Sequence, residues 1–425
     1  GLDSHTKYSK TCHRESSTKS KGSIESSTTS PRNPPEQSSG NNQVTELPQG
    51  FTVHVGNVGI KDESNDILII HCAGGATSAG VFTQNRFAGP SIDISRRHIA
   101  SKKTDAVVIV SKNANVATGE SGHSDAQELA DLVATAVDAQ SSDVIVGSTG
   151  VIGVPYPMDK IRDYMNRVSA PFLDRSAEAA ATAIMTTDTH PKVATSLIGQ
   201  ASIVGIAKGV GMIEPDMATM IAVITTDAAL DPDRMDQMFR DVVAQTFNAL
   251  SVDTDTSTSD MAVILTSGQA GAVDEAQFEV ALQDVCLDLT RQLAADGEGA
   301  ETLIVVDVTS ARDNEQARKV AKAIVNSPLV KTAVHGRDPN WGRVAMAVGK
   351  TNEPDIDQSR VTIAFGGQEV YPALATNNTL ADLETYLASE EVHISVDLGI
   401  ADGHFTAYGC DLTDGYVRIN ADYTT

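Results

Sequence analysis

The sequence predicts an α/β protein in which mixed β-sheets are flanked by helices. Short runs rich in Val and Ile are typical of buried strands. Segments with apolar residues at helical spacing lie between these runs. The chain has 425 residues, of which 41% are hydrophobic, which is enough for a sizeable core and predicts two or three domains. The pattern alone leaves the topology of the sheets open.

The first part of the chain differs in composition from the rest. Residues 1–43 are rich in Ser and Thr, and their only large aliphatic side chains are Leu2 and Ile24. Such a segment cannot bury enough apolar surface to offset its ordering entropy, so we expect a disordered tail. A Ser-rich, weakly basic tail is typical of the remnant of an organelle-targeting leader, and a plain disordered linker is an equal alternative.

Runs of Val and Ile predict eight strands after this tail. Each run is short and is bounded by residues that favour turns. The predicted strands cover residues 66–72, 105–110, 143–147, 201–206, 261–266, 302–308, 343–348 and 392–398.

Helical periodicity and capping residues predict four long helices between the strands. Ser124 and Gln127 form a capping-box pattern ahead of apolar residues at helical spacing. Asp231 followed by Pro232 is typical of a helix start, and apolar residues over 235–247 mark one helical face. Segments 274–295 and 313–325 show the same periodicity. Strands and helices therefore alternate along the chain, as in other α/β proteins.

Charge and cysteine content exclude several classes of partner. The formal net charge is −24, whereas phosphate binding needs clustered Lys and Arg, so nucleic acid and anionic membranes are not expected partners. No apolar run is long enough for a transmembrane helix. The four cysteines form no CxxC pair and the histidines show no metal-ligand spacing. Neither a disulfide framework nor a metal or other cofactor is predicted.

The segment 205–224 (GIAKGVGMIEPDMATMIAVI) can be interpreted in two ways. In one, a glycine-rich loop enters a buried strand and Thr219 is an ordinary strand residue. In the other, cleavage after the small residue Ala218 gives Thr219 a free α-amine. Such an amine has a pKa of about 7.7–8.0, so it can accept the proton of the Thr219 hydroxyl near neutral pH. No separate histidine is then needed, and the chain has no GxSxG or HExxH motif.

The same segment resembles the self-cleaving ornithine acetyltransferases, also called glutamate N-acetyltransferases. Residues 208–220 (KGVGMIEPDMATM) are especially similar to that family. Further similar blocks follow the family's order from about residue 50 to the end of the chain. They are 148–153 (STGVIG), 183–189 (AIMTTDT), 296–299 (DGEG), 331–343 (KTAVHGRDPNWGR) and 420–425 (NADYTT).

The resemblance implies a layered αββα architecture of the N-terminal-nucleophile type. It implies a catalytic core over residues 44–310 and a smaller C-terminal α/β domain over 311–425 that completes the active site. The chain would cleave itself between Ala218 and Thr219, and two copies of each fragment would assemble as a heterotetramer. The implied reaction moves acetyl from N2-acetyl-L-ornithine to L-glutamate through an acetyl ester on Thr219, in a ping-pong cycle.

Matching positions imply roles for individual residues. Thr219 matches the nucleophile, and Thr149 and Gly150 match two oxyanion-hole donors, which stabilise charge present only in the tetrahedral intermediate. Lys208 can supply a cation for the substrates' α-carboxylate, and Glu298 suits the cationic end of ornithine. The positions that match substrate contacts are Thr186, Lys208, Thr219, Glu298, Asn420 and Thr425.

One block departs from most members of the arginine pathway. Positions 254 and 259 are Thr and Ser, where most members have Gly and Asn. This block and residues 408–412 (YGCDL) resemble the ornithine acetyltransferases of clavulanic-acid gene clusters. The resemblance therefore implies arginine biosynthesis or a related secondary-metabolite pathway.

Two other functions stay open at this point. A self-processing aminopeptidase or amidase of the same architecture would let water, rather than glutamate, reach the acyl-enzyme. A non-enzymatic amino-acid-binding protein would never be cleaved. The expected partners are small molecules, and the expected location is the cytoplasm, or an organelle if the tail is a leader remnant.

Overall fold

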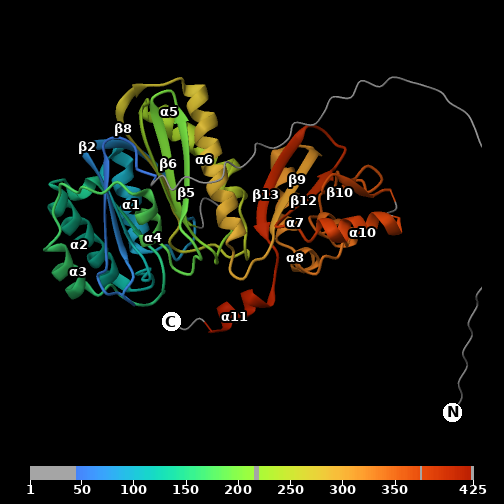
Figure 1. The fold of residues 1–425 in the computed structure, drawn as a ribbon, viewed down its shortest axis with the longest axis horizontal. Coiled ribbons are helices and arrows are strands. Elements are labelled where there is room, and N and C mark those ends of the chain that lie inside the picture. Colours follow the sequence, from blue (N-terminus) through green and yellow to red (C-terminus); the bar gives the residue numbers. More distant parts are fainter. Residues whose placement is uncertain (1–44, 215–219, 374–375, 423–425) are drawn as a thin grey trace, which may run out of the picture. The chain divides into compact units, whose positions relative to one another are not determined.

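The structure is a computed structural model that describes residues 45–214, 220–373 and 376–422 (Figure 1). The predicted tail over residues 1–43 lies outside the described residues, as do Ala218, Thr219 and Thr425. The described residues form one compact unit. Among the helices described, none has the length and apolar character needed to cross a lipid bilayer.

The larger sheet has eight strands in the order β4-β3-β2-β8-β7-β6-β5, with β1 paired to β2. Strand β2 is long: its first half pairs with β3 and its second half with β8, and the register with β3 shifts between His71 and Ala76. The bounds are β1 Phe51–Gly56, β2 Ile67–Phe82, β3 Lys103–Val110, β4 Val144–Ser148, β5 Lys192–Ile198, β6 Ala201–Lys208, β7 Ile221–Ala229 and β8 Met261–Ala272.

Alternating side chains on these strands build the layers. On β2, Ile67 and Ile69 point to one core, and Leu68 and Ile70 point to another, as the period of two requires. The core around Leu68 also takes Val223 and other side chains from β6, β7 and β8, so it lies between the two halves of the sheet. Helices cover the two outer cores.

The helices α2 and α3 pack on the β2–β3–β4 half, and α5 and α6 pack on the β6–β7–β8 half. Figure 1 shows these helix pairs on opposite flanks of the strands. The order helix, strand, strand, helix confirms the predicted layered α/β architecture. The helices of this part are α1 Pro90–His98, α2 Gly119–Val137, α3 Met158–Met165, α4 Ala177–Ala183, α5 Pro232–Gln245 and α6 Glu275–Ala295.

The smaller sheet has five strands in the order β11-β10-β12-β9-β13. Its core packs against α7, α8 and α9. The predicted domain boundary at 310/311 falls inside β9, whose partners β12 and β13 both follow that boundary. The bounds are β9 Leu303–Ala311, α7 Asn314–Val325, α8 Pro328–His335, α9 Trp341–Gly349, β10 Thr362–Phe365, β11 Gln368–Tyr371, α10 Asn377–Tyr386, β12 Glu391–Asp397, β13 Gly403–Cys410 and α11 Asp414–Asp422.

The strand predicted over 343–348 is wrong, because this segment belongs to helix α9. Val344, Ala347 and Val348 are buried at helical spacing, whereas Met346, which a strand would bury with Val344, is 41% exposed. The apolar residues at 344, 346 and 348 are compatible with a strand and with a helix. Burial of two adjacent residues, Ala347 and Val348, on the side that also buries Val344 fits the helix.

The capping box predicted at Ser124 is also wrong. Helix α2 begins at Gly119, after Thr118, and the Ser124 hydroxyl donates to the Glu120 carbonyl one turn earlier at 3.2 Å. The other helix starts are confirmed: the side chains of Asp231, Asp274 and Asp313 each accept from backbone N–H groups of the first turn.

Candidate active site

A cavity lies where β4 and β6 end and where β7 and β8 begin. Lys208, the last residue of β6, pairs with Ile221, the first residue of β7, in an antiparallel ladder. Ile221 also pairs with Met261, the first residue of β8, in a parallel ladder. Thr149 and Gly150 directly follow β4 and line the same cavity, which has a volume of about 270 Å³.

The cavity brings together most of the residues predicted for the site. Four of them precede position 218 in the chain, one follows α6 and one belongs to α11. The predicted residues that line it are Thr149, Gly150, Thr186, Lys208, Glu298 and Asn420. Ala218, Thr219 and Thr425 lie outside the described residues, although Met220, bonded to Thr219, lines the cavity.

The turn after β4 requires glycine at position 150. The Thr149 N–H donates to the Val110 carbonyl at 3.0 Å, which continues the contact between β4 and β3. Gly150 has a φ of +130°, and a Cβ there would lie 2.2 Å from the backbone carbon of Lys112. Because any other residue would clash with this backbone, only glycine lets the main chain lie against the segment that follows β3, along the cavity wall.

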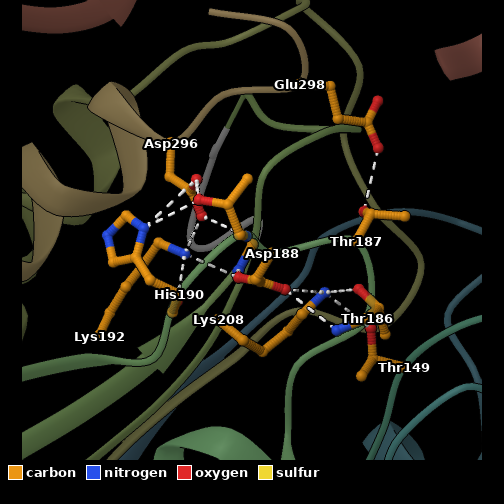
Figure 2. A network of polar contacts seen from close by, with 11 residues as sticks. Thr149, Thr186, Thr187, Asp188, His190, Lys192, Lys208, Asp296 and Glu298 are labelled. Atoms are coloured by element: carbon orange, nitrogen blue, oxygen red, sulfur yellow. Dashed lines mark hydrogen bonds and ion pairs between the residues drawn. The ribbon is translucent and has the colours of Figure 1, made fainter.

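Lys208 is buried at the cavity wall and its ammonium points to hydroxyl groups. Its Nζ donates to Thr186 Oγ1 at 2.7 Å and to Thr149 Oγ1 at 3.4 Å, and it lies 3.9 Å from Asp188 Oδ2 (Figure 2). Burial lowers the pKa of Lys208, and the charge of Asp188 opposes this change. The ammonium therefore lies where an anionic ligand would stabilise it.

A chain of buried charges continues behind Lys208. Asp188 accepts from Lys192 Nζ at 2.9 Å and from the Gly209 N–H at 2.7 Å. Lys192 also donates to Asp296 at 2.6 Å (Figure 2). Burial alone would raise the pKa of Asp188, but Lys208 and Lys192 outweigh it, so the pKa is about 2. Asp188 is thus ionised and fixes the position of the Lys208 strand end.

Glu298 forms a second polar corner of the cavity. Its two carboxylate oxygens accept from Thr187 Oγ1 at 3.1 Å and from Asn420 Nδ2 at 2.8 Å. A Cβ on Gly211 would lie 2.5 Å from the Glu298 carboxylate, so the glycine loop leaves room for this side chain. Asn420 belongs to α11, and its contact ties the C-terminal helix to the cavity.

Two acidic residues of the site were missed from sequence. Asp188 lies in the block 183–189, but its role follows only from its contacts with Lys192 and Lys208. Lys192 in turn contacts the distant Asp296. Asp260 directly precedes β8, lines the cavity and is 2% exposed. A carboxylate at the entry of a strongly apolar strand is the one sequence signal that could have pointed to it.

Among the described residues, one group of side chains has the atoms to hold a metal ion: Glu301, His335 and Asp411. His335 Nδ1 lies 3.2 Å from Asp411 Oδ2, and the other Asp411 oxygen accepts from the backbone N–H groups of Glu301 and Thr302. These hydrogen bonds account for the arrangement, and none of the three residues lines the cavity.

Comparisons with known proteins match almost the whole described chain. The model of the ArgJ family matches residues 52–425. Glutamate N-acetyltransferase Oat2 of Streptomyces clavuligerus is 51% identical over 385 residues, which cover 89% of this chain and 98% of that protein. Arginine biosynthesis bifunctional protein ArgJ 2 of a Nostoc species is 49% identical, with 90% and 99% covered. A crystal structure of the argJ protein of Bacillus halodurans is 41% identical and covers 47% of this chain and 97% of that chain, with a TM-score of 0.44.

Proposed function

Because the chain belongs to the ArgJ family, we propose that it is a glutamate N-acetyltransferase that moves acetyl from N2-acetyl-L-ornithine to L-glutamate. The observation that carries this proposal is the cavity itself. Lys208, two threonine hydroxyls and Glu298 line it, which suits a small amino acid with a carboxylate and an ammonium group. The names of the relatives support arginine biosynthesis as the pathway. A related secondary-metabolite pathway is the other proposal, and it rests on the block around positions 254 and 259.

The active enzyme is produced by cleavage of its own chain, before any acetyl transfer. The Thr219 hydroxyl attacks the carbonyl carbon of Ala218, the peptide C–N bond breaks, and water hydrolyses the resulting ester. Thr219 then carries both a hydroxyl and an α-amine. The amine takes the proton of the hydroxyl as the oxygen attacks a carbonyl carbon, so one residue is both nucleophile and base.

The acetyl group passes through an ester on Thr219. When the Thr219 oxygen attacks the acetyl carbonyl of N-acetylornithine, the carbonyl oxygen becomes negative. The C–N bond then breaks, and the amine of Thr219 returns its proton to the departing α-amine of ornithine. Glutamate next attacks the ester with its own α-amine, loses a proton to the Thr219 amine, and leaves as N-acetylglutamate when that proton returns to the Thr219 oxygen.

Thr149 and Gly150 are the proposed donors to the negative oxygen. The Thr149 hydroxyl already accepts from Lys208 Nζ, at 3.4 Å, so its own hydrogen is free to point to a ligand. The positive charge of Lys208 strengthens that donor. Stabilisation of an oxygen that is charged only in the intermediate lowers the barrier rather than the ground state.

Lys208 and Glu298 are the proposed recognition pair. Lys208 and Thr186 bind the α-carboxylate that both substrates carry. Each Glu298 oxygen has one donor, Thr187 or Asn420, and keeps a lone pair for the δ-ammonium of ornithine. Thr425 is a further proposed contact, as the resemblance implies.

Assembly and location are part of the same proposal. Two fragments of each kind, residues 1–218 and 219–425, are expected to form a heterotetramer. We expect the enzyme to work in the cytoplasm, or in an organelle if residues 1–43 are a leader remnant.

Cleavage and transfer can be tested on one preparation. We expect two bands on a denaturing gel, and N-terminal sequencing of one band should start at Thr219. The purified enzyme should release ornithine from N-acetylornithine in a glutamate-dependent reaction, because a transferase must keep water from the ester. Thr219→Ala should stay uncut and inactive, whereas the matched variant Thr219→Ser, which keeps a hydroxyl, should be cut.

Two outcomes would contradict this proposal. An uncut chain with full activity would exclude the nucleophile. Ornithine release that needs no glutamate would favour the alternative, a self-processing aminopeptidase or amidase.

A further inference from the structure

The two substrates of the proposed reaction differ in charge at one end. Both carry an α-carboxylate, but the side chain of ornithine ends in an ammonium group and that of glutamate ends in a carboxylate. Glu298 on the cavity wall suits the ammonium group and would repel a second carboxylate at the same corner. An enzyme that alternates between these substrates therefore needs another place in the cavity for the glutamate side chain.

The corner around Glu298 has no side-chain donor left for a carboxylate. The Thr187 hydroxyl donates to Oε1 of Glu298 at 3.1 Å (Figure 2). Asn420 Nδ2 donates to Oε2 of Glu298 at 2.8 Å and to the Tyr416 carbonyl at 3.0 Å, so both of its hydrogens are used. These donors already have acceptors, and the remaining lone pairs of Glu298 can only accept, as from an ammonium group.

A pair of hydroxyl groups lines the cavity just before β8. Thr258 and Ser259 are 9% and 5% exposed, and both lie on the cavity wall. Thr258 Oγ1 and Ser259 Oγ are 3.4 Å apart, so one hydroxyl can donate to the other. The second hydrogen of the pair has no acceptor among the described residues, and a carboxylate oxygen in the cavity would accept it.

The surroundings of this hydroxyl pair favour an anion more than the Glu298 corner does. Ser257 Oγ accepts from the Ser259 N–H at 3.2 Å, and the Ser257 side chain hydrogen-bonds to Asp260. Burial raises the pKa of Asp260 well above its ordinary value, while hydroxyl groups and Lys208 oppose this change. A raised pKa favours the uncharged carboxyl, which does not repel a carboxylate in the way that Glu298 does.

The strand register separates the hydroxyl pair from Glu298. Lys208 at the end of β6 is level with Ile221 on β7, which is level with Met261 at the start of β8. Neighbouring strands lie about 4.8 Å apart, so the start of β8 is roughly 10 Å from the end of β6. Glu298 lies on the β6 side, because its N–H donates to the carbonyl of Val210, just after β6, at 2.8 Å. The cavity thus has an acidic corner on one side and a hydroxyl wall on the other.

We propose that the hydroxyl pair of Thr258 and Ser259 binds the γ-carboxylate of glutamate, whereas Glu298 binds the δ-ammonium of ornithine. This inference rests on the proposed function and assigns the residues that let one cavity accept two substrates of opposite side-chain charge. Lys208 holds the α-carboxylate of either substrate, and the side chain turns to the side of the cavity that matches its charge. Thr258 and Ser259 are thus specificity-determining residues for the acceptor.

The two acceptors can be compared on the same acetyl-enzyme. Labelled ornithine exchanges into N-acetylornithine, glutamate forms N-acetylglutamate, and kcat/KM for each acceptor reports its own reaction with the ester. The double variant Thr258→Val with Ser259→Ala should lower kcat/KM for glutamate roughly 10- to 100-fold, the effect of losing a hydrogen bond to a charged group. The value for ornithine should stay within about twofold. Glu298→Gln should give the reverse pattern, with the loss for ornithine.

The matched control is a second pair of buried hydroxyls. Ser78 Oγ and Thr104 Oγ1 lie 2.7 Å apart, and both residues are fully buried but do not line the cavity. The double variant Ser78→Ala with Thr104→Val should leave the ratio of the two kcat/KM values unchanged, even where it lowers stability. Ser259→Ala alone should lower the ratio in the same direction as the double variant, and it serves as the test if the double variant does not fold.

Three results would overturn this inference while the proposed function stands. In a wild-type enzyme that transfers acetyl from N-acetylornithine to glutamate, the first is an unchanged ratio in the hydroxyl variants. The second is an equal loss for both acceptors, which would assign the hydroxyls to a group that the acceptors share. The third is a loss for glutamate alone in Glu298→Gln. Failure of the wild-type chain to be cut or to transfer acetyl would instead overturn the function itself.

Discussion

Two neighbouring regions of one polar network hold a buried lysine in opposite ways. Lys192 is fully buried between two carboxylates, Asp188 at 2.9 Å and Asp296 at 2.6 Å. Lys208 lies on the other side of Asp188, 3.9 Å from it, and donates to two hydroxyls at the cavity wall. The comparison teaches that the charge of Lys192 is neutralised within the fold, whereas that of Lys208 stays available to a ligand.

The largest expected effect is on stability, at Lys192. Lys192→Met leaves Asp188 and Asp296 buried with one cation fewer, which we expect to lower the free energy of unfolding by about 3–5 kcal/mol. Urea unfolding measures this loss. The control is Lys331→Met, another buried lysine, which donates to the Val252 carbonyl at 2.8 Å and should cost less. If the free energy of unfolding fell equally in the two variants, the pairing of Lys192 with two carboxylates would have no special structural importance.

The next effect is on activity, at Lys208. Lys208→Met removes a charged donor to the substrate carboxylate, and we expect kcat/KM to fall roughly 10- to 100-fold. Asp188 keeps Lys192 as its partner, so the stability loss should be smaller than in Lys192→Met. Steady-state kinetics with both substrates, beside urea unfolding, separates the two quantities. A variant with normal KM for both substrates would show that Lys208 binds neither carboxylate.

The smallest effect is a shift in acid stability. The pKa of Asp188 is about 2 in the folded protein, below the ordinary 3.8, so unfolding takes up a proton in acid. Asp188 therefore contributes about 2 kcal/mol above pH 4, and this contribution is lost as the pH falls towards 2. Lys208→Met should raise the Asp188 pKa and begin the loss at higher pH. Unfolding free energies measured between pH 2 and 5 would show whether Lys208 acts on Asp188 at all.

Local patterns predicted the elements well where one period dominated. The Val- and Ile-rich runs of β2, β3 and β8, the start of α5 at Asp231 and the helical periodicity of α6 and α7 are local signals, and the structure confirms them. Residues 343–348 fit two periods at once, so only tertiary burial decides for α9. Two adjacent glycines, Gly74 and Gly75, favour a turn from local sequence alone. Strand β2 nevertheless continues past them, because its residues 77–82 pair with β8.

The site was predictable in part, through its family blocks. Thr149, Thr186, Lys208, Glu298 and Asn420 come from distant segments, and the structure brings them to one cavity. Asp188 and Asp296 also lie in family blocks, but their contacts with Lys192 could not be predicted, because a pair 104 residues apart leaves no local pattern. The place of Asp260 on the cavity wall depends on strand register, which no composition or spacing fixes.

The position of β7 in the larger sheet has a consequence for the two fragments. β7 lies between β6, which precedes residue 218, and β8, which follows it, and it pairs with both. Cleavage as proposed leaves one continuous sheet shared by two polypeptides. If residues 1–218 and 219–425 were expressed from two separate genes, each fragment would expose an unpaired, apolar strand edge. Such edges tend to aggregate before the two fragments can associate. Under the proposed cleavage, the intact precursor would act as the template for its own assembly, because it would fold before it is cut.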